Sequence, residues 1–186
     1  MNVKDMLRQA SDAAKQLITL SDQTIIGILK ETAQVLRTHT EEVLAANRQD
    51  LERMDPANPK YDRLKLTEER LQGIAADMEN VSTLPSPLNK VLSETTRPNG
   101  MVIRKVTVPF GVIGVIYEAR PNVTFDVFSL CFRSGNVCVL KGGSDADFSN
   151  RALVRIIHSV LERQGINPAV CTLLPPDREA TAELLG

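Results

Sequence analysis

The side chains best suited to chemistry lie in two short segments, each of which follows an apolar run. The first segment is EARPNVT at residues 118–124. Within it, Asn122 could offer its side-chain amide to an oxyanion, and Pro121 could fix the direction of that amide. An oxyanion donor typically lowers a reaction barrier by about 3 kcal/mol. The structural alternative is that Asn122 or Thr124 only caps the helix that follows.

Arg120 in the same segment has two possible partners. Its guanidinium could hold an anionic substrate. It could equally pair with Glu118, two residues away on the same strand face. The residues favour the ion pair with Glu118 over the substrate contact.

The second segment is KGGS at residues 141–144, between a predicted strand and a predicted helix. Ligands bind at the carboxyl ends of parallel strands, and glycines such as Gly142 let a ligand approach the backbone. A helix amino terminus capped by Ser144 or Asp145 would also favour an anion. Lys141 and a hydroxyl here could hold a nucleotide's ribose or its 2′-phosphate. The lysine precedes the glycines, so this is not a P-loop, and an ordinary strand-to-helix turn is the alternative.

The cysteines do not have the surroundings of a nucleophile or a metal site. Cys131, Cys138 and Cys171 are an odd number of thiols, each in an apolar context. This context predicts buried, reduced side chains and no disulfide framework. His39 and His158 are isolated on predicted helices and complete neither a Cys-His pair nor a metal site. The sequence therefore predicts no metal.

The first part of the chain is predicted to be helical and to lead into a ribbon. Residues 1–83 carry apolar positions at helical spacing, with a break or new cap near Asn47 and a further helix after Thr67. Residues 84–110 alternate apolar and polar positions around the turn signal PNG at 98–100. This pattern predicts a two-stranded ribbon, and such exposed ribbons often pair with another chain.

The last part of the chain alternates short apolar runs with helix-length segments. The runs are 112–117, 137–140 and 170–173; the helical segments are 123–133, 145–164 and 177–185. Continuous apolar strands between helices indicate βαβ units and a parallel sheet covered on both faces. The fold class is therefore α/β, with a Rossmann-like sheet that is incomplete because three strands are few for this architecture. Gly111 and Gly114 precede or interrupt a strand, so close packing explains them better than a dinucleotide fingerprint.

Composition excludes several classes of function. The chain has 22 basic and 23 acidic side chains, a net charge of −1, and no basic cluster, which argues against a nucleic-acid partner. No apolar stretch approaches the roughly 20 residues of a membrane span. The amino terminus carries no export signal, so a cytoplasmic location is expected.

Two long runs carry a resemblance to a known family. VPFGVIGVIYEARPNVT at 108–124 and SGNVCVLKGGS at 134–144 closely resemble the γ-glutamyl phosphate reductases of the aldehyde dehydrogenase superfamily. ANRQD at 46–50 and DRL at 62–64 also resemble that family, which extends the similarity to the whole chain as an amino-terminal portion. The resemblance implies that residues 1–83 form the helical front of the cofactor domain, 84–110 an oligomerisation ribbon, and 111–186 a partial nucleotide-binding domain.

The resemblance also implies an activity and a set of site residues. The activity is NADPH-dependent reduction of L-glutamate 5-phosphate to L-glutamate 5-semialdehyde in proline synthesis, through a cysteine thioester and hydride transfer. Asn122 matches the superfamily's oxyanion asparagine, and Lys141 matches the lysine that contacts the adenosine ribose. Ser144 stands where NAD-preferring relatives carry an acidic residue, which leaves room for a 2′-phosphate. Gly142 and Pro121 are likewise expected to take part in cofactor binding.

Three further expectations follow from the resemblance. The family's nucleophilic cysteine should lie beyond Gly186, so the chain alone is expected to be inactive. Arg120 is the candidate substrate contact, and a homo-oligomer is left open. The competing hypothesis is a non-catalytic binding or assembly module that uses the helical front and the ribbon around Gly100. An aldehyde dehydrogenase for another substrate conflicts with the EARPNVT run.

Overall fold

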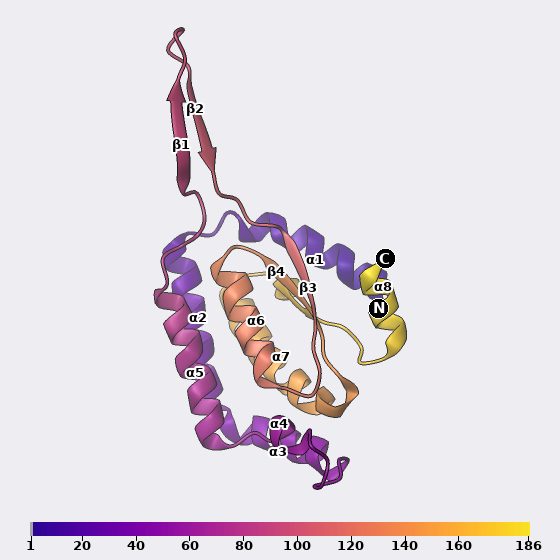
Figure 1. The fold of residues 1–186 in the computed structure, drawn as a ribbon. Helices are drawn as coiled ribbons and strands as arrows, with labels where there is room; N and C mark the ends of the chain where they lie inside the picture. Colours follow the sequence, from indigo (N-terminus) through magenta and orange to yellow (C-terminus); the bar gives the residue numbers. More distant parts are fainter. Residues whose placement is uncertain (1) are drawn as a thin grey trace.

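Three parallel strands form the sheet at the centre of the molecule (Figure 1). A computed structural model describes residues 2–186. The strands are β3 (Val112–Ile116), β4 (Val137–Lys141) and β5 (Cys171–Leu173), in the order β3-β4-β5. Every residue of the central strand β4 is buried. The predicted parallel sheet and its three apolar runs are therefore confirmed.

Helices cover both faces of this sheet, as continuous apolar strands require. The crossover helices α6 (Asn122–Arg133) and α7 (Asp147–Arg163) pack against β4 and β5 on one face. The first helix, α1 (Val3–Leu17), crosses all three strands on the other face and contacts α8 (Arg178–Leu185) (Figure 1). The two ends of the described chain thus lie on the same side of the sheet.

A further layer of helices lies outside the crossovers. It consists of α2 (Asp22–Thr38) and α5 (Glu68–Thr83), which pack on each other and on α7 and α6. Helices α3 (Thr40–Glu52) and α4 (Tyr61–Leu64) cross at one end of this layer (Figure 1). Thr67 caps α5 by accepting a hydrogen bond from the amide of Arg70, which confirms the predicted start of this helix.

The predicted break near Asn47 is wrong. The helical run breaks at His39 instead, between α2 and α3, where Thr38 and Thr40 donate their hydroxyls to carbonyls of the preceding turn. Such hydroxyls compete with the helical hydrogen-bond ladder. Asn47 lies inside α3 and is buried, because its amide donates to the Leu64 carbonyl and its oxygen accepts from the Leu66 amide.

An antiparallel ribbon projects away from the body (Figure 1). It consists of β1 (Val91–Thr96) and β2 (Val102–Val106), and all its residues are exposed. Gly100 in the connecting turn has φ of +81°, a conformation that glycine adopts without strain. The predicted ribbon is confirmed.

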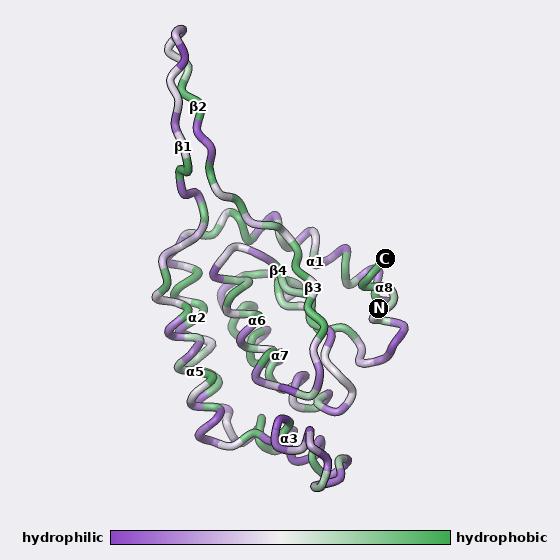
Figure 2. Tube along the Cα trace, viewed as in Figure 1, coloured by the Kyte–Doolittle hydropathy of each residue, from purple (hydrophilic) through white to green (hydrophobic). Residues whose placement is uncertain are grey.

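Apolar packing joins the layers, and a small second cluster supports the loops beside the sheet. The main core includes Phe125, Phe128 and Phe132 of α6, together with residues 137–140 of β4. The second cluster contains Leu64, Ala119 and Ala146, which come from three separate segments. Hydrophobic colour also runs along the edge strand β3, whose side chains are only partly covered (Figure 2). Within residues 2–186, no helix is both long enough and apolar enough to cross a bilayer.

Candidate functional site

The loops that follow β3 and β4 meet at the carboxyl edge of the sheet. Gly143, after β4, lies so close to the loop after β3 that a Cβ would sit 3.6 Å from the Glu118 carbonyl carbon. Ala119 and Ala146 pack in the same small cluster under these loops. The two segments that the sequence singled out for chemistry therefore come together, as parallel strand ends predict.

A chain of hydrogen bonds ties the two loops to α7. Thr124 donates its hydroxyl to Oδ1 of Asn150 at 3.0 Å, so Tyr117 is the donor in its 2.8 Å bond to Thr124. Burial raises the pKa of the Tyr117 phenol, which keeps it protonated as a donor. A Cβ on Gly142 would lie 2.3 Å from Nδ2 of Asn150. The absence of a side chain at Gly142 is thus required by the protein's own packing.

Asn122 is the first residue of α6 and does not cap it. The amino-terminal flanking residue is Pro121, which is buried, and no side chain caps this helix end. Instead the Asn122 amide nitrogen donates to Oδ2 of Asp126 at 3.1 Å, and Thr124 is used in the chain described above. The capping alternative for both residues is wrong. The bond to Asp126 fixes the Asn122 amide and leaves its second N–H available.

The carboxyl group of Asp126 has an unusual environment. Burial raises its pKa, the hydrogen bond from Asn122 lowers it, and the negative charge of Asp77 raises it. Burial is the largest of these effects, so the pKa lies above its ordinary value. The Asn122 amide therefore donates to a carboxyl group that is protonated more readily than an exposed aspartate.

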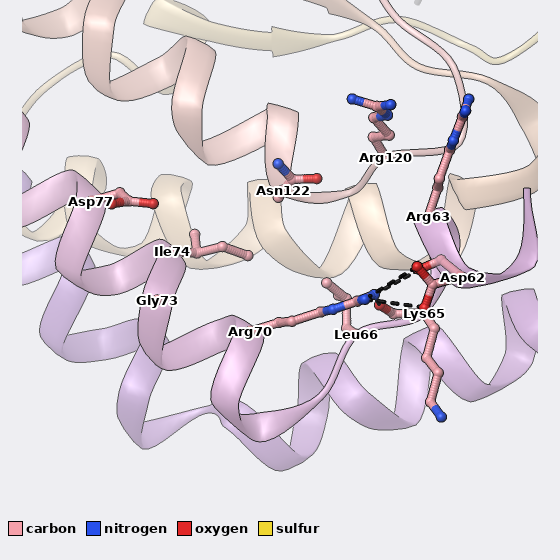
Figure 3. A pocket seen from close by; sticks show the side chains of 10 residues that line it. All are labelled: Asp62, Arg63, Lys65, Leu66, Arg70, Gly73, Ile74, Asp77, Arg120 and Asn122. Atoms are coloured by element: carbon pink, nitrogen blue, oxygen red, sulfur yellow. Dashed lines mark hydrogen bonds and ion pairs between the residues drawn. The ribbon is translucent and has the colours of Figure 1, made fainter.

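A pocket of about 340 Å³ opens beside Asn122 (Figure 3). Its walls carry four basic side chains and two carboxylates. The lining residues are Asp62, Arg63, Lys65, Leu66, Arg70, Gly73, Ile74, Asp77, Arg120 and Asn122. The pocket brings Arg120 and Asn122 together with α4 and α5. Sequence reasoning missed Arg63 and Arg70, which lie far from the strand motifs.

The predicted ion pair between Arg120 and Glu118 is wrong. Glu118 lies 3.9 Å from Nζ of Lys60 instead. Successive residues after the strand end do not share one strand face, because the loop bends at Ala119, which is buried between its exposed neighbours. Arg120 is therefore turned toward the pocket (Figure 3).

Lys141 ends β4 with a buried ammonium group. Its Nζ donates to the carbonyl of Gly142 at 3.2 Å and to that of Pro176 at 3.0 Å. The second contact ties the loop after β4 to the loop after β5. An ammonium group has three N–H donors, so one remains for a ligand.

The amino terminus of α7 is filled by the protein's own carboxylate. Neither Ser144 nor Asp145 caps it; a short 3₁₀ turn (Ser144–Ala146) precedes the helix. Asp50 of α3 accepts from the amides of Phe148 and Ser149 at 3.1 and 2.8 Å, and from the Ser149 hydroxyl at 2.6 Å. The predicted cap is wrong, and the predicted preference for an anion at this end is met from within the chain.

Arg53 connects this carboxylate to the turn after β4. Its guanidinium donates to Asp50 at 2.8 Å and to the Ser144 carbonyl at 3.2 Å, and it lies over the Phe148 ring at 4.6 Å. Ser144 itself is exposed and lines a hollow of about 300 Å³. The charged side chains around this hollow are those of Arg53, Lys60, Asp50, Asp55 and Asp145. Nothing in the local pattern around residue 50 signals these contacts.

The three thiols are free and buried. Burial raises the pKa of Cys131 to about 12. A hydrogen bond with Cys171 and burial raise the pKa of Cys138 well above its ordinary value. A protonated thiol is a poor nucleophile. Within the described chain, no group of three or more histidine, cysteine or acidic side chains is arranged to hold a metal ion.

Comparison with solved structures defines the fold class. No family model matches the chain. Over 98% of its length the chain superimposes on a probable aldehyde dehydrogenase of Listeria monocytogenes with a TM-score of 0.71 and 17% identity, covering 38% of that protein. At this identity the likeness concerns the fold alone. The chain thus has part of the aldehyde dehydrogenase fold.

Closer relatives define the particular kind of protein. The γ-glutamyl phosphate reductase of Thermotoga maritima matches the whole chain with a TM-score of 0.95 and 31% identity, over 46% of its own length. The γ-glutamyl phosphate reductase of Parabacteroides distasonis is 99% identical over all 186 residues. The chain spans 45% of the length of that relative. The resemblance to γ-glutamyl phosphate reductase is therefore confirmed along the whole chain.

Proposed function

We propose that this chain supplies the cofactor-binding part of a γ-glutamyl phosphate reductase, an enzyme that reduces L-glutamate 5-phosphate to L-glutamate 5-semialdehyde with NADPH in cytoplasmic proline synthesis. The observation that carries the proposal is the 99% identity over all 186 residues to a protein of that name. The meeting of the EARPNVT and KGGS segments at one sheet edge supports it, since this is where α/β folds bind ligands.

In this proposal Asn122 is the oxyanion donor. Asn122 lines the pocket, and Asp126 holds its amide through one N–H, which leaves the other for an oxyanion. A donor fixed before the reaction stabilises developing charge without reorganising, and is worth about 3 kcal/mol of barrier. Pro121 supports this orientation by fixing the backbone that enters α6. Arg120, in the same pocket, contacts the anionic substrate.

The residues around the turn after β4 suit an adenine dinucleotide with a 2′-phosphate. Ser144 is exposed, Arg53 and Lys60 are each about half exposed beside it, and Lys141 keeps one free N–H. Hydroxyl and cationic donors are the groups that bind ribose and phosphate. The cofactor supplies the hydride when it is bound. Gly142 takes part in this proposal through its carbonyl, which accepts from Lys141 and so orients the ammonium group.

None of the three cysteines in this chain is the nucleophile in this proposal. Each is buried, and the raised pKa values of Cys131 and Cys138 keep these thiols protonated. The acyl group must therefore be attacked by a thiol that another part of a whole reductase provides. The purified chain should oxidise no NADPH when given L-glutamate 5-phosphate, and turnover by the chain alone would contradict this assignment.

Residues 84–110 favour a second role in assembly. The ribbon projects from the body and exposes Leu92, Val102 and Ile103, each by 44% or more. Exposed strand pairs with apolar side chains are sites for pairing with another chain. We propose that a homo-oligomer forms through this ribbon, and that residues 1–83 and 111–186 together bind the cofactor.

Substitution of Ser144 tests the cofactor assignment with little risk to the fold, because the side chain is exposed. Ser144→Asp should weaken NADPH binding by about fivefold or more, since two unit charges 4 Å apart repel by about 1 kcal/mol even in water. NADH, which lacks the 2′-phosphate, should bind at least as tightly, because the new carboxylate can accept from its ribose 2′-hydroxyl. Ser144→Asn is the uncharged control, and fluorescence titration is the measurement. Equal weakening of NADPH and NADH by Ser144→Asp would refute a 2′-phosphate contact at this residue.

Substitution of Lys141 completes this test. Lys141→Ala should reduce the affinity for both cofactors, because the ammonium is assigned to the ribose that they share. Lys15→Ala, near the other end of α1, removes a lysine that is 79% exposed beside the segment before β3, and serves as the matched control. Wild-type affinity in the Lys141→Ala variant would argue that its two carbonyl contacts are its whole role.

A further inference from the structure

Arg70 is held in place by the protein and is not free for a ligand. One of its terminal nitrogens donates to the carbonyls of Asp62 and Lys65, each at 2.6 Å. The other donates to the Asp62 carboxylate at 3.1 Å (Figure 3). These contacts fasten the segment after α4 to the start of α5. Arg70 therefore shapes the wall of the pocket.

Arg63 and Arg120 differ from Arg70 because their guanidinium groups are not held by other residues of the described chain. Within the described part of the chain, neither guanidinium has a hydrogen bond or an ion pair with another residue, and both side chains are exposed. They come from separate segments, α4 and the loop after β3, yet line the same pocket (Figure 3). Two guanidinium groups facing one hollow repel each other. An anion bound between them would remove this repulsion and add charge-assisted hydrogen bonds.

The charges of the pocket are separated between its two ends. Asp77 lines the end toward the middle of α5, whereas Arg63 and Arg120 lie at the opposite end (Figure 3). Asp62 also lies at the arginine end, but its carboxylate is paired with Arg70. Asp126, which binds Asn122, adds a second carboxyl group near the Asp77 end. An anion is therefore repelled from one end and attracted to the other. This arrangement favours a ligand that carries its negative group at the end with the two arginines.

We propose that Arg63, together with Arg120, forms a receptor for a phosphate or carboxylate group of the substrate. The identity of the substrate as an acyl phosphate of an acidic amino acid rests on the proposed function. Arginine presents a planar fork of donors that fits either oxyanion. The receptor holds this group beside Asn122, and thereby sets the distance between the anion and the oxyanion donor.

Titration of the chain with inorganic phosphate, and separately with L-glutamate, tests this receptor. Amide chemical shifts at constant ionic strength report binding to each variant. Arg63→Met and Arg120→Met should each raise the dissociation constant by about fivefold, the effect expected of an exposed charge contact of about 1 kcal/mol. Arg8→Met on α1, whose side chain is 81% exposed, removes the same charge far from the pocket and should leave binding unchanged.

The two probes separate the possible sources of the anion. Saturable binding of phosphate that depends on Arg63 assigns the receptor to the phosphoryl group, and saturable binding of L-glutamate assigns it to a carboxylate. Either result supports the receptor. Unchanged affinity for both anions in Arg63→Met would overturn it, as would a failure of the unsubstituted chain to saturate with either.

A parallel NADPH titration keeps this inference distinct from the proposed function. Anion binding that depends on Arg63, without any NADPH binding, would leave the receptor standing and remove support from the cofactor assignment. NADPH binding together with an anion affinity that does not depend on Arg63 would support the cofactor assignment and overturn the receptor. Far-ultraviolet circular dichroism of each variant confirms that the fold is retained, which is expected because both arginines are exposed.

Discussion

The substitution Asp50→Ala probes the contact that joins α3 to the start of α7 and, through Arg53, to the turn after β4. Asp50 is buried in α3, and its carboxylate accepts from two amides and one hydroxyl at the start of α7. It also accepts from Arg53, which holds the carbonyl of Ser144. Alanine removes every one of these acceptors at once.

The expected cost is the sum of two effects. Loss of a helix cap costs about 1 kcal/mol. The Ser149 hydroxyl, which is fully buried, loses its acceptor, and an unsatisfied buried group costs about 2 kcal/mol. Arg53 adds little because its side chain is 50% exposed and can turn to water. Asp50→Ala should therefore lower the free energy of unfolding by about 3 kcal/mol.

Urea unfolding followed by circular dichroism measures this cost. With a slope of about 2 kcal/mol per molar, the midpoint should fall by about 1.5 M. Asp50→Asn retains one oxygen acceptor, so its urea midpoint should fall by less than half as much. Asp12→Ala removes an exposed carboxylate from α1 and should leave the midpoint unchanged. The reasoning would be refuted if the urea midpoint of Asp50→Ala lay within about 0.3 M of that of the unsubstituted chain, because the expected shift is about 1.5 M.

Two further predictions concern the packing of the site and its thiols. Gly142→Ala should destabilise the chain by about 2 kcal/mol, because its Cβ would lie 2.3 Å from the amide of Asn150. Adding Asn150→Ala should recover part of that loss, and a purely additive pair in urea unfolding would contradict the steric explanation. Cys131 should resist Ellman's reagent at pH 8 in the folded chain, since burial raises its pKa to about 12. Folding then favours the protonated thiol, so its contribution to stability is full below pH 9 and declines as the pH rises toward 12. Rapid labelling of native Cys131 would contradict its burial.

Sequence patterns predicted the elements whose determinants are local. Residues 137–140 of β4 are consecutive apolar residues because both faces of the strand are covered. The ribbon turns at Asn99 and Gly100 because glycine adopts the positive φ there. The helix that follows Thr67 is predictable because the Thr67 hydroxyl accepts from the amide of Arg70, only three residues further along the chain. In each case the cause lies within a few residues of the effect.

The errors arose where a distant partner decides the role of a side chain. Asn47 resembled a helix break because asparagine disfavours helix interiors, but Leu64 and Leu66 satisfy its amide across the fold. Ser144 was expected to cap α7, but the carboxylate of Asp50 accepts the hydrogen bond from the Ser149 amide at that helix end. Glu118 was expected to pair with the nearby Arg120, but it lies 3.9 Å from Lys60, which belongs to another segment. No local pattern encodes these partners, since each belongs to a separate segment.

The position of Asp50 also limits how a dinucleotide can bind. A helix amino terminus holds a phosphate through its free amides, but in α7 the amides of Phe148 and Ser149 already bind a carboxylate. A pyrophosphate placed there would meet the Asp50 charge at close range and would be repelled. The turn after β4 is therefore suited to the ribose end of a cofactor, where the Ser144 hydroxyl and the guanidinium of Arg53 lie. Under the proposed function, the pyrophosphate would therefore be bound by groups other than the amides of α7.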